Sequence, residues 1–593
     1  MEYMARDANL NDPRMRADAV EAAQGRRPFS ILIENARVLD MVTGRERKAD
    51  IGITGALIAS VHEPGRLKDA EDRIDAAGAY ALPGFIDTHM HVESSMVTPA
   101  EYAAAVVPRG VTTVVWDPHE LANACGMAGV DYAIEAARDT ILRLLPLAPT
   151  CVPSAPGYEF SGGDFGPDTV AKLLDNPEIH GAAELMTMQP LLSGDPRVRD
   201  IVNAGLASSK RICGHARGLA GADLAAYAAA GVGTDHELTS ADDLLAKLEA
   251  GLTIELRGSH EHLLPEFARA LCALGHLPQT VTLCTDDVFA DDLFSRGGLD
   301  LVIRLLIEHG LPPEWAYRAA TLNAATRIGR PDLGFVAPGR RADIALVPDL
   351  AEVRPATVIM DGKVEARYGA LLSKTPVQPV AKDLLNTMRA PRISPADFEV
   401  TANGPRARIA TLSRPRFPEW GERDVEVEDG RLVLPEDMIR MAVVNRYGRN
   451  TPVRVAFMEN WGAWSGAFAS SVSHDCHNLT VFGREPEDMA AAANAVRDTQ
   501  GGIAVVRGGS VIASLALPIA GLLSPEPLED VAAAFAEVRK ATDGLVDWQP
   551  PYLVFKALFG ASLVCNAGPR LSDVGLVDAF NGQVRESCVI AKD

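Results

Sequence analysis

The stretch "PGFIDTHMHVESS", Pro83 to Ser95, is the part of the sequence that most constrains the fold. It places His89 and His91 two residues apart at the end of an apolar run, although the chain has only 13 histidines. Side chains at positions i and i+2 of a strand point to the same face of a sheet, so we expect both imidazoles to face one point. That geometry suits a metal ion.

Apolar runs alternate with helical segments in the region that follows. Each run has the length and composition of a buried strand. Eight such units within about 250 residues match the size of a (β/α)₈ barrel, so we predict an α/β fold of this kind. The expected strands lie within residues 81–91, 111–120, 148–157, 179–186, 210–218, 231–238, 252–258 and 281–287, and a helix is expected over 131–145.

The remaining sequence divides around this barrel, which we assign to residues 83–330. Short β-like runs punctuated by Gly and Pro occupy residues 29–82 and 331–370, and we expect them to form one small discontinuous β-sandwich domain. After a Pro-rich connector, residues 390–593 are expected to form an extra C-terminal α+β domain. Residues 1–28 mix charged and small side chains, and we expect a mobile tail there.

Composition excludes several classes of function. The chain has 57 basic and 79 acidic residues, and its net charge of −22 disfavours binding to nucleic acid or to an anionic membrane. The sequence shows neither a signal peptide nor an apolar run long enough to span a bilayer. Its eight cysteines have no paired spacing, as expected for reduced thiols. We therefore predict a cytoplasmic protein that acts on a small molecule.

Side chains able to bind metal recur at the ends of the predicted strands. Active sites of β/α barrels lie at the C-terminal ends of the strands, so residues from five strand ends are expected to meet. A single histidine at a strand end is more often structural, so the prediction depends on how many such residues occur together. The expected ligands are His89, His91, Glu184, His215, His236 and Asp286.

This ligand set indicates the kind of metal. Imidazole and carboxylate ligands without thiolate suit manganese, iron or zinc, and the carboxylates favour the harder ions. Glu184, shared between four histidines, would allow two ions about 3.5–4 Å apart. We therefore expect two divalent ions per site, with manganese or iron favoured and zinc also compatible.

The sequence resembles the amidohydrolase superfamily over residues 29 to about 365. The likeness is carried by "PGFIDTHMH", the strand-end histidines, Asp286 and "LGFVAPGRRADIALV" at residues 333–347. Within the superfamily it is similar to the bacterial adenine deaminases, through "THMHVESSMVTP", "WDPHELANACG", "GHARGL", "TDHELTS" and "CTDDVFADDL". The third region adds "VVNRYGRN" and "FASSVSHDCHNLTVFG", which extends the likeness over nearly the whole chain after residue 29.

The resemblance implies a reaction and a division of roles. It implies hydrolytic deamination of adenine to hypoxanthine and ammonia by a metal-activated hydroxide, with a purine as the small-molecule substrate. A carboxylated lysine or a glutamate bridges the metals in this superfamily, and we assign the bridge to Glu184 because no lysine lies at a strand end. Asp286 would bind metal and move protons. A homo-oligomer, specifically a dimer, is also expected.

Other acids and histidines near strand ends are candidates for contacting the purine. Glu120 is expected to act as a second catalytic residue by donating a proton to ring nitrogen N1. Orientation of the metal-bound imidazoles is the alternative role for these side chains. The expected substrate contacts are Asp287, Asp117, His119 and Glu237.

Three other functions are compatible with parts of this pattern. A cyclic-amide hydrolase of the dihydroorotase or hydantoinase kind stays open, although such enzymes usually carry the bridging lysine. A zinc deaminase of the cytidine type is excluded because the chain has no Pro-Cys-x-x-Cys. Retention of every expected ligand argues against a scaffold that has lost its metal. The segment "SHDCH", residues 473–477, is expected to cap the barrel, whereas His260 and His262 are expected to play no chemical role.

Overall fold

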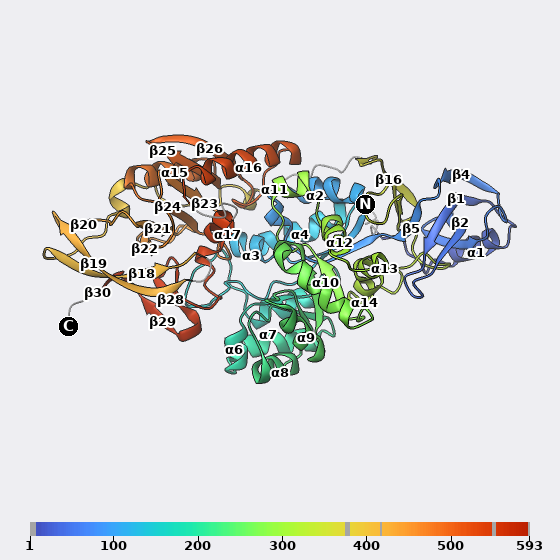
Figure 1. Ribbon diagram of the computed structural model, residues 1–593, viewed down its shortest axis with the longest axis horizontal. Coiled ribbons are helices and arrows are strands. Elements are labelled where there is room, and N and C mark those ends of the chain that lie inside the picture. Colours follow the sequence, from blue (N-terminus) through green and yellow to red (C-terminus); the bar gives the residue numbers. More distant parts are fainter. Residues whose placement is uncertain (1–6, 374–379, 416–417, 548–552, 591–593) are drawn as a thin grey trace.

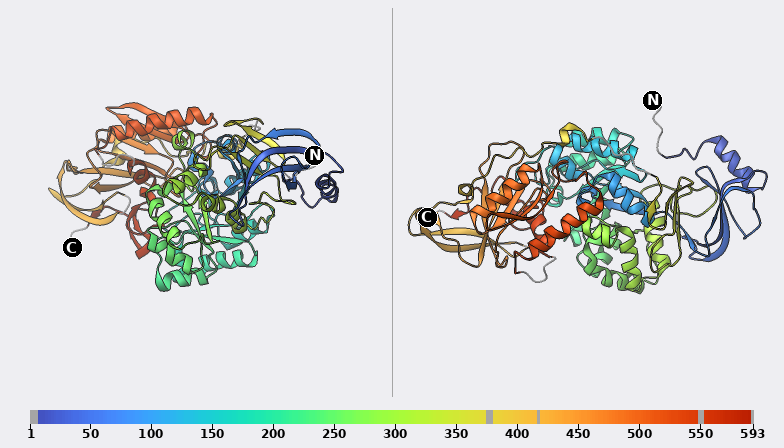
Figure 2. Two further views of the ribbon diagram at one scale, coloured as in Figure 1. Left: turned by 45° about the vertical axis from the view of Figure 1, so that its right-hand side comes forward. Right: turned by 90° about the horizontal axis from the view of Figure 1, so that it is seen from above.

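The computed structural model describes residues 7–373, 380–415, 418–547 and 553–590. The molecule is elongated, with a central α/β region between a β-rich N-terminal part and a C-terminal part of sheet and helices (Figures 1 and 2). Among the described residues, no helix has the length and apolar character needed to cross a membrane.

The central region contains eight short strands in sequence order. β7 pairs in parallel with both β6 and β8, and β12 pairs in parallel with both β11 and β13. β9 and β10 form a third parallel pair. Single bridges add Ala148 to Ala182 after β8, and Met90 to Asp286 between the ends of β6 and β13, so the last strand lies beside the first. The strands are β6 (Phe85–Met90), β7 (Val111–Trp116), β8 (Arg143–Pro146), β9 (Gly181–Leu185), β10 (Arg211–Gly214), β11 (Thr234–Asp235), β12 (Thr253–Arg257) and β13 (Val281–Cys284).

Helices follow these strands and bury their apolar sides against them. Strand residues Leu144, Ile254 and Leu283 share one large hydrophobic core with helix residues such as Ala133 and Leu271. The main helices are α2 (Pro99–Val106), α4 (Met127–Asp139), α5 (Pro167–Asp175), α7 (Pro196–Ala207), α8 (Gly221–Ala229), α9 (Ala241–Glu249), α10 (Leu264–Ala273), α12 (Leu299–Glu308) and α13 (Pro313–Arg318).

The third strand is not where the sequence suggested. The expected strand at 148–157 contains no named strand, and the expected helix over 131–145 ends at Asp139 in α4. The strand is β8 instead, in which all four side chains are buried. A fully buried run of four residues lacks the alternation that distinguishes a strand from a helix, which explains the error.

The two β-rich segments join in one hydrogen-bonded sheet of nine strands. β14 runs antiparallel to β5, with Ile344 opposite Pro83, and this pairing connects residues far apart in the sequence. The strands are β1 (Phe29–Leu39), β2 (Glu46–Thr54), β3 (Leu57–His62), β4 (Ala70–Asp75), β5 (Tyr80–Pro83), β14 (Ile344–Val347), β15 (Thr357–Met360), β16 (Lys363–Arg367) and β17 (Ala370–Leu371).

Much of the expected mobile tail is ordered, so that prediction is wrong for residues 7–28. Helix α1 (Pro13–Ala23) begins at an Asp12 cap whose side chain accepts a hydrogen bond from the Arg14 backbone N–H. Ala19 and Ala22 on this helix are buried in a small core with Phe29 and other residues of the N-terminal sheet. The apolar face of α1 is only a few small residues wide, which makes it hard to recognise from sequence. Residues 1–6 lie outside the described part.

Among the described residues, the C-terminal region contains a ten-stranded sheet with helices packed on it. Helix α15 (Pro486–Asp498) packs on β23, β24 and β25, whereas α16 (Leu528–Asp543) lies across β25 and β26 and contacts α11 (Ala290–Ser295) of the central region. The longer strands are β18 (Arg406–Ser413), β19 (Glu419–Glu428), β21 (Met438–Val444), β22 (Arg454–Glu459), β23 (Ala467–Ser470), β24 (Leu479–Gly483), β25 (Gly502–Arg507) and β26 (Ser510–Ala516).

Candidate metal centre and active site

Glu184 lies at the centre of a group of four histidines. Its Oε1 atom is 3.7 Å from His89 Nε2 and 3.3 Å from His91 Nε2. Its Oε2 atom is 2.6 Å from His215 Nδ1 and 3.4 Å from His236 Nε2. Each oxygen of one carboxylate therefore faces its own pair of imidazoles, an arrangement that can place the carboxylate between two metal ions.

Asp286 approaches the same point from the end of β13. Its Oδ1 atom lies 3.4 Å from both His89 Nε2 and His91 Nε2. Its Oδ2 atom accepts a hydrogen bond of 3.0 Å from Ser259 Oγ and lies 3.1 Å from Arg257 Nη1. Oδ1 thus faces the histidines, while Oδ2 is held by Arg257 at the end of β12 and by Ser259 just after it.

The local structure explains why these six side chains meet. His89 lies near the end of β6, and Glu184 lies near the end of β9. His215 and His236 directly follow β10 and β11. Because parallel strands end at the same edge of a sheet, all these side chains project from one end of the central region. Each of the six is at most 5% exposed, so the group is shielded from water.

The donor set fits divalent metal. Four imidazoles and two carboxylates without thiolate suit manganese, iron or zinc. His89 Nε2 and His91 Nε2 lie only 3.1 Å apart, and both face the carboxylates of Glu184 and Asp286. Buried imidazole nitrogens and carboxylate oxygens that converge on one point are the ligand atoms that a cation site requires. Overlapping groups of these residues converge closely enough to ligate an ion.

The charges of the two carboxylates depend on their neighbours. Burial alone would raise the pKa of Glu184, but His236 and His215 outweigh it and hold the pKa well below its usual range. Burial likewise opposes ionisation of Asp286, and Arg257, His89 and His91 outweigh it, so this pKa is also well below normal. Both groups are therefore anionic near neutral pH.

Asp117, directly after β7, is hydrogen-bonded to three neighbouring parts of the site. Its carboxylate accepts 3.1 Å hydrogen bonds from the backbone N–H groups of His119 and Glu184. Its backbone oxygen lies 3.0 Å from His91 Nδ1, which leaves His91 Nε2 facing Glu184 and Asp286. The carboxylate expected to contact substrate is thus already engaged with the protein.

Glu237 is engaged in a similar way. Its two oxygens contact the guanidinium groups of Arg217 and Arg257. These two arginines outweigh the effect of burial and, with His215, hold the pKa of Glu237 well below its usual range. The nearby Asp235 accepts a 2.8 Å hydrogen bond from the buried Lys247 Nζ. Acid and base side chains therefore support the loops after β11 and β12.

Glu120 lies at the start of α3 (His119–Cys125), beside a loop of the C-terminal region. Its Oε1 atom is 3.3 Å from His474 Nδ1, and its Oε2 atom is 3.9 Å from His477 Nε2. Burial raises the pKa of Glu120 to about 8, so the carboxyl can hold a proton near neutral pH. The loop Ser473–Asn478 thus reaches the site, as the sequence suggested for "SHDCH".

Several residues of the site were missed or judged differently from sequence. Arg257, to which the sequence assigned no role in the site, makes ion pairs with both Asp286 and Glu237. His260 joins this group indirectly, because its Nε2 atom lies 3.0 Å from Arg257 Nη2. Ser259 carried no sequence signal beyond its place after a strand. Its role depends on a contact across 27 residues.

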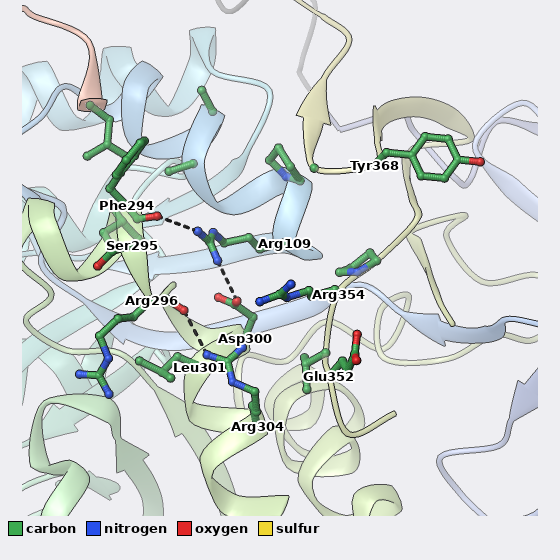
Figure 3. Close-up of a pocket in the computed structure, with 18 of the residues that line it drawn as sticks. Arg109, Phe294, Ser295, Arg296, Asp300, Leu301, Arg304, Glu352, Arg354 and Tyr368 are labelled. Atoms are coloured by element: carbon green, nitrogen blue, oxygen red, sulfur yellow. Dashed lines mark hydrogen bonds and ion pairs between the residues drawn. The ribbon is translucent and has the colours of Figure 1, made fainter. Parts of the chain in front are cut away.

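A separate cavity of about 1090 Å³ lies between the central region, the segment that follows β14 and the start of α16 (Figure 3). Arginine side chains enter it, and Arg109 Nη1 lies 3.2 Å from Asp300 Oδ2. None of the six candidate metal ligands, Glu184 included, lines this cavity. The candidate metal centre is therefore distinct from it.

Comparison with known proteins agrees with this geometry. Residues 80–364 match the model of the amidohydrolase family, and residues 416–583 match that of the adenine deaminase C-terminal domain. The chain is 57% identical over 585 residues to adenine deaminase 2 of Rhizobium etli, which covers 98% of each chain. It is 47% identical over 590 residues to adenine deaminase of Klebsiella pneumoniae, covering 98% of this chain and 97% of that protein.

The mixed α/β fold and the histidine–carboxylate cluster define a metal-dependent hydrolase of the amidohydrolase superfamily. The similarity to proteins named adenine deaminase over nearly the full length narrows the assignment from the superfamily to one family. The chain belongs to the adenine deaminase family.

Proposed function

We propose that the chain hydrolyses adenine to hypoxanthine and ammonia. The observation that carries this proposal is the buried carboxylate of Glu184 between two pairs of histidines, in a chain of the adenine deaminase family. Membership of that family favours a purine over a cyclic amide. The second candidate, a dihydroorotase-like or hydantoinase-like reaction, has no contact in the site that favours it.

The proposed architecture is a (β/α)₈ barrel at residues 83–330. Support comes from eight parallel strands whose last member lies beside the first. Residues 29–82 and 331–370 would form the small discontinuous β-sandwich domain, in line with the pairing of β5 and β14. Residues 390–593 would form the C-terminal α+β domain.

The proposed cofactor is a pair of divalent ions. His89, His91 and Asp286 would hold one ion, His215 and His236 would hold the other, and Glu184 would bridge them. Manganese or iron is favoured because carboxylates are part of the set, and zinc is also compatible. When bound, such ions lower the pKa of water so that hydroxide is available near neutral pH.

The reaction requires the movement of two protons. The oxygen of water bonds to C6 of adenine and the bond from C6 to the amino nitrogen breaks. One proton of the water ends on the departing ammonia and the other on N1. Asp286 is placed to take and return a proton, because its Oδ1 faces the cluster while Ser259 and Arg257 hold its Oδ2.

Glu120 is the proposed donor to N1. Its buried carboxyl, with a pKa raised to about 8, can carry the proton that a ring nitrogen needs. Asp287 and His119 are the proposed direct contacts of the purine. Asp117 and Glu237 would act on substrate through the groups that they hold, because both carboxylates have protein partners.

The binding partners, oligomeric state and localisation of the protein are also proposals. A net charge of −22 supports a small-molecule substrate without nucleic acid or membrane as partners. A homodimer in the cytoplasm stays a prediction from the sequence, and light scattering measures the oligomeric state directly.

An ultraviolet assay tests the function. We expect the manganese-loaded protein to shift the absorbance of adenine to that of hypoxanthine, with release of one ammonia per adenine. Dihydroorotate, a hydantoin and adenosine serve as controls. Turnover of a cyclic amide without turnover of adenine would establish the second candidate instead.

A further inference from the structure

A second group of buried polar atoms lies beside the candidate metal centre. Both oxygens of Glu120, His477 Nε2, Asp475 Oδ2 and Asp287 Oδ1 have no hydrogen-bond partner among the described residues, and Glu120 Oε1 has only an ion-pair contact with His474 Nδ1. Glu120 is 1% exposed and His477 is fully buried. Leaving a buried polar atom unpaired is unfavourable, so several at one place indicate a bound group that pairs with them.

These atoms come from two regions of the chain. Glu120 belongs to α3 of the central region, whereas His474, Asp475 and His477 belong to the loop between β23 and β24. The closest approaches are 3.3 Å between His474 Nδ1 and Glu120 Oε1 and 3.9 Å between His477 Nε2 and Glu120 Oε2. The group therefore forms at the seam between the regions.

One imidazole connects this group to the metal centre. His119 Nδ1 lies 3.8 Å from Glu184 Oε1, and His119 Nε2 lies 3.8 Å from Asp475 Oδ1. A ligand whose reacting carbon lies near Glu184 would thus have its far atoms within reach of the loop.

The loop is held firmly against the central region. Tyr447 Oη donates to the backbone oxygens of Asn123 and Cys476, and Asn478 Nδ2 donates to Phe160 O at 3.1 Å. His477 has a φ of 50°, a left-handed conformation that is unfavourable for a non-glycine residue. Contacts elsewhere in the loop maintain this conformation, which directs the imidazole toward Glu120.

We infer that the C-terminal region completes the substrate site: His474 and His477, together with Glu120, bind the nitrogen-bearing edge of a planar heterocyclic base. This inference rests on the proposed function and adds the part of the molecule that recognises the base. A carboxyl and two imidazoles offer both donors and acceptors, which matches the alternating ring nitrogens and amino group of a free purine.

Paired variants at the two histidines test the inference. His474→Ala and His477→Ala remove the nitrogens, whereas His474→Asn and His477→Gln keep a polar atom near the position of Nδ1 and Nε2, respectively. His276→Gln, on an exposed side chain, is the matched control. The measurements are KM and kcat for adenine, hypoxanthine binding by calorimetry, metal content and melting temperature.

We expect each alanine variant to weaken hypoxanthine binding and raise KM for adenine by about 10-fold to 100-fold. The amide variants should recover most of this loss and keep the wild-type melting temperature, and metal content should be unchanged in all four variants. A purely structural role would lower the melting temperature in alanine and amide variants alike, and that result would overturn the inference.

Two further outcomes would also overturn it. Unchanged hypoxanthine binding and unchanged KM in an active enzyme would exclude recognition by the loop and leave the proposed function intact. A third ion per wild-type chain that is lost in His477→Ala would assign the group to a metal instead. A metal-loaded wild type without adenine turnover would overturn the proposed function and this inference together.

Discussion

Glu184 is the residue on which the contacts of the candidate metal centre converge. Each of its oxygens faces two imidazoles, and the negative charge that it carries offsets the charge of bound cations. A carboxylate shared between two sites would offset part of the charge of two cations held close together, so this side chain is expected to determine how many ions the site retains.

Glu184→Gln tests this expectation. The amide keeps the shape of the side chain but loses its charge and one acceptor oxygen, so we expect at least one ion per chain to be lost. Turnover of adenine should fall by about 100-fold or more, since metal-site changes of this kind cost at least 10–100-fold. Metal analysis and kcat provide the measurements. Glu178→Gln, at a half-exposed surface ion pair, is the control, and full metal content with full turnover in Glu184→Gln would contradict the assignment.

The six candidate metal ligands could be predicted from the sequence because each lies near the end of a strand. The i and i+2 spacing of His89 and His91 carries the prediction on its own. Arg257 and His474 could not be placed in this way, because their roles depend on contacts with Asp286 and Glu120 that only the folded chain creates. A residue that acts through its partner leaves no local pattern.

Short elements decide how well the fold itself can be predicted. β11 has two residues and β8 has four, which is too few for a periodic signal. Amphipathic helices such as α10 and α12 carry a clearer signal, because their apolar residues recur with helical spacing. The order of strands and helices could thus be predicted, whereas the position of the third strand required the surrounding core.

Helix α1 provides a test at this scale. Ala22 is fully buried, whereas Val20 on the same helix is 55% exposed. We expect Ala22→Asp to lower the melting temperature by several degrees, because it forces an unpaired charge into the small core around Phe29. Val20→Asp should change it by less than about 1 °C. Equal melting temperatures for both variants would mean that the helix does not pack as described.

The central and C-terminal regions meet over an extended surface. Arg539 of α16 makes hydrogen bonds of 2.7 and 2.8 Å to Asp291 of α11, and the Ser524 N–H donates to Met96 O at 2.8 Å. Near the site, Phe160 N donates to Asp573 Oδ1 at 3.0 Å. The two regions therefore share both surface ion pairs and buried polar contacts.

Glu159 lies in this interface and predicts a pH dependence. Burial raises its pKa from 4.5 to about 7, and Asp475 of the C-terminal loop adds to the rise against the hydrogen bond from Ser154. Between these two pH values the unfolded chain releases the Glu159 proton first, so stability falls as pH rises and is lowest above pH 7. The shift corresponds to roughly 3 kcal/mol at most.

Glu159→Gln removes this dependence. The variant should melt at a higher temperature than the wild type at pH 8, and the difference should disappear near pH 5. Calorimetric melting at both pH values measures it, with Glu178→Gln as the exposed control. A constant difference across this range would show that the carboxyl does not change its ionisation on folding.

The antiparallel pairing of β5 with β14 has a consequence for how the chain is made. One edge of β5 is completed by a strand that leaves the ribosome about 260 residues later. At synthesis rates of about 5–20 residues per second, that edge waits on the order of 13–50 s for its partner. During this interval the nascent sheet is open to pairing with other chains, so cells that translate this protein rapidly or shield the nascent chain with chaperones should recover more of it in native form.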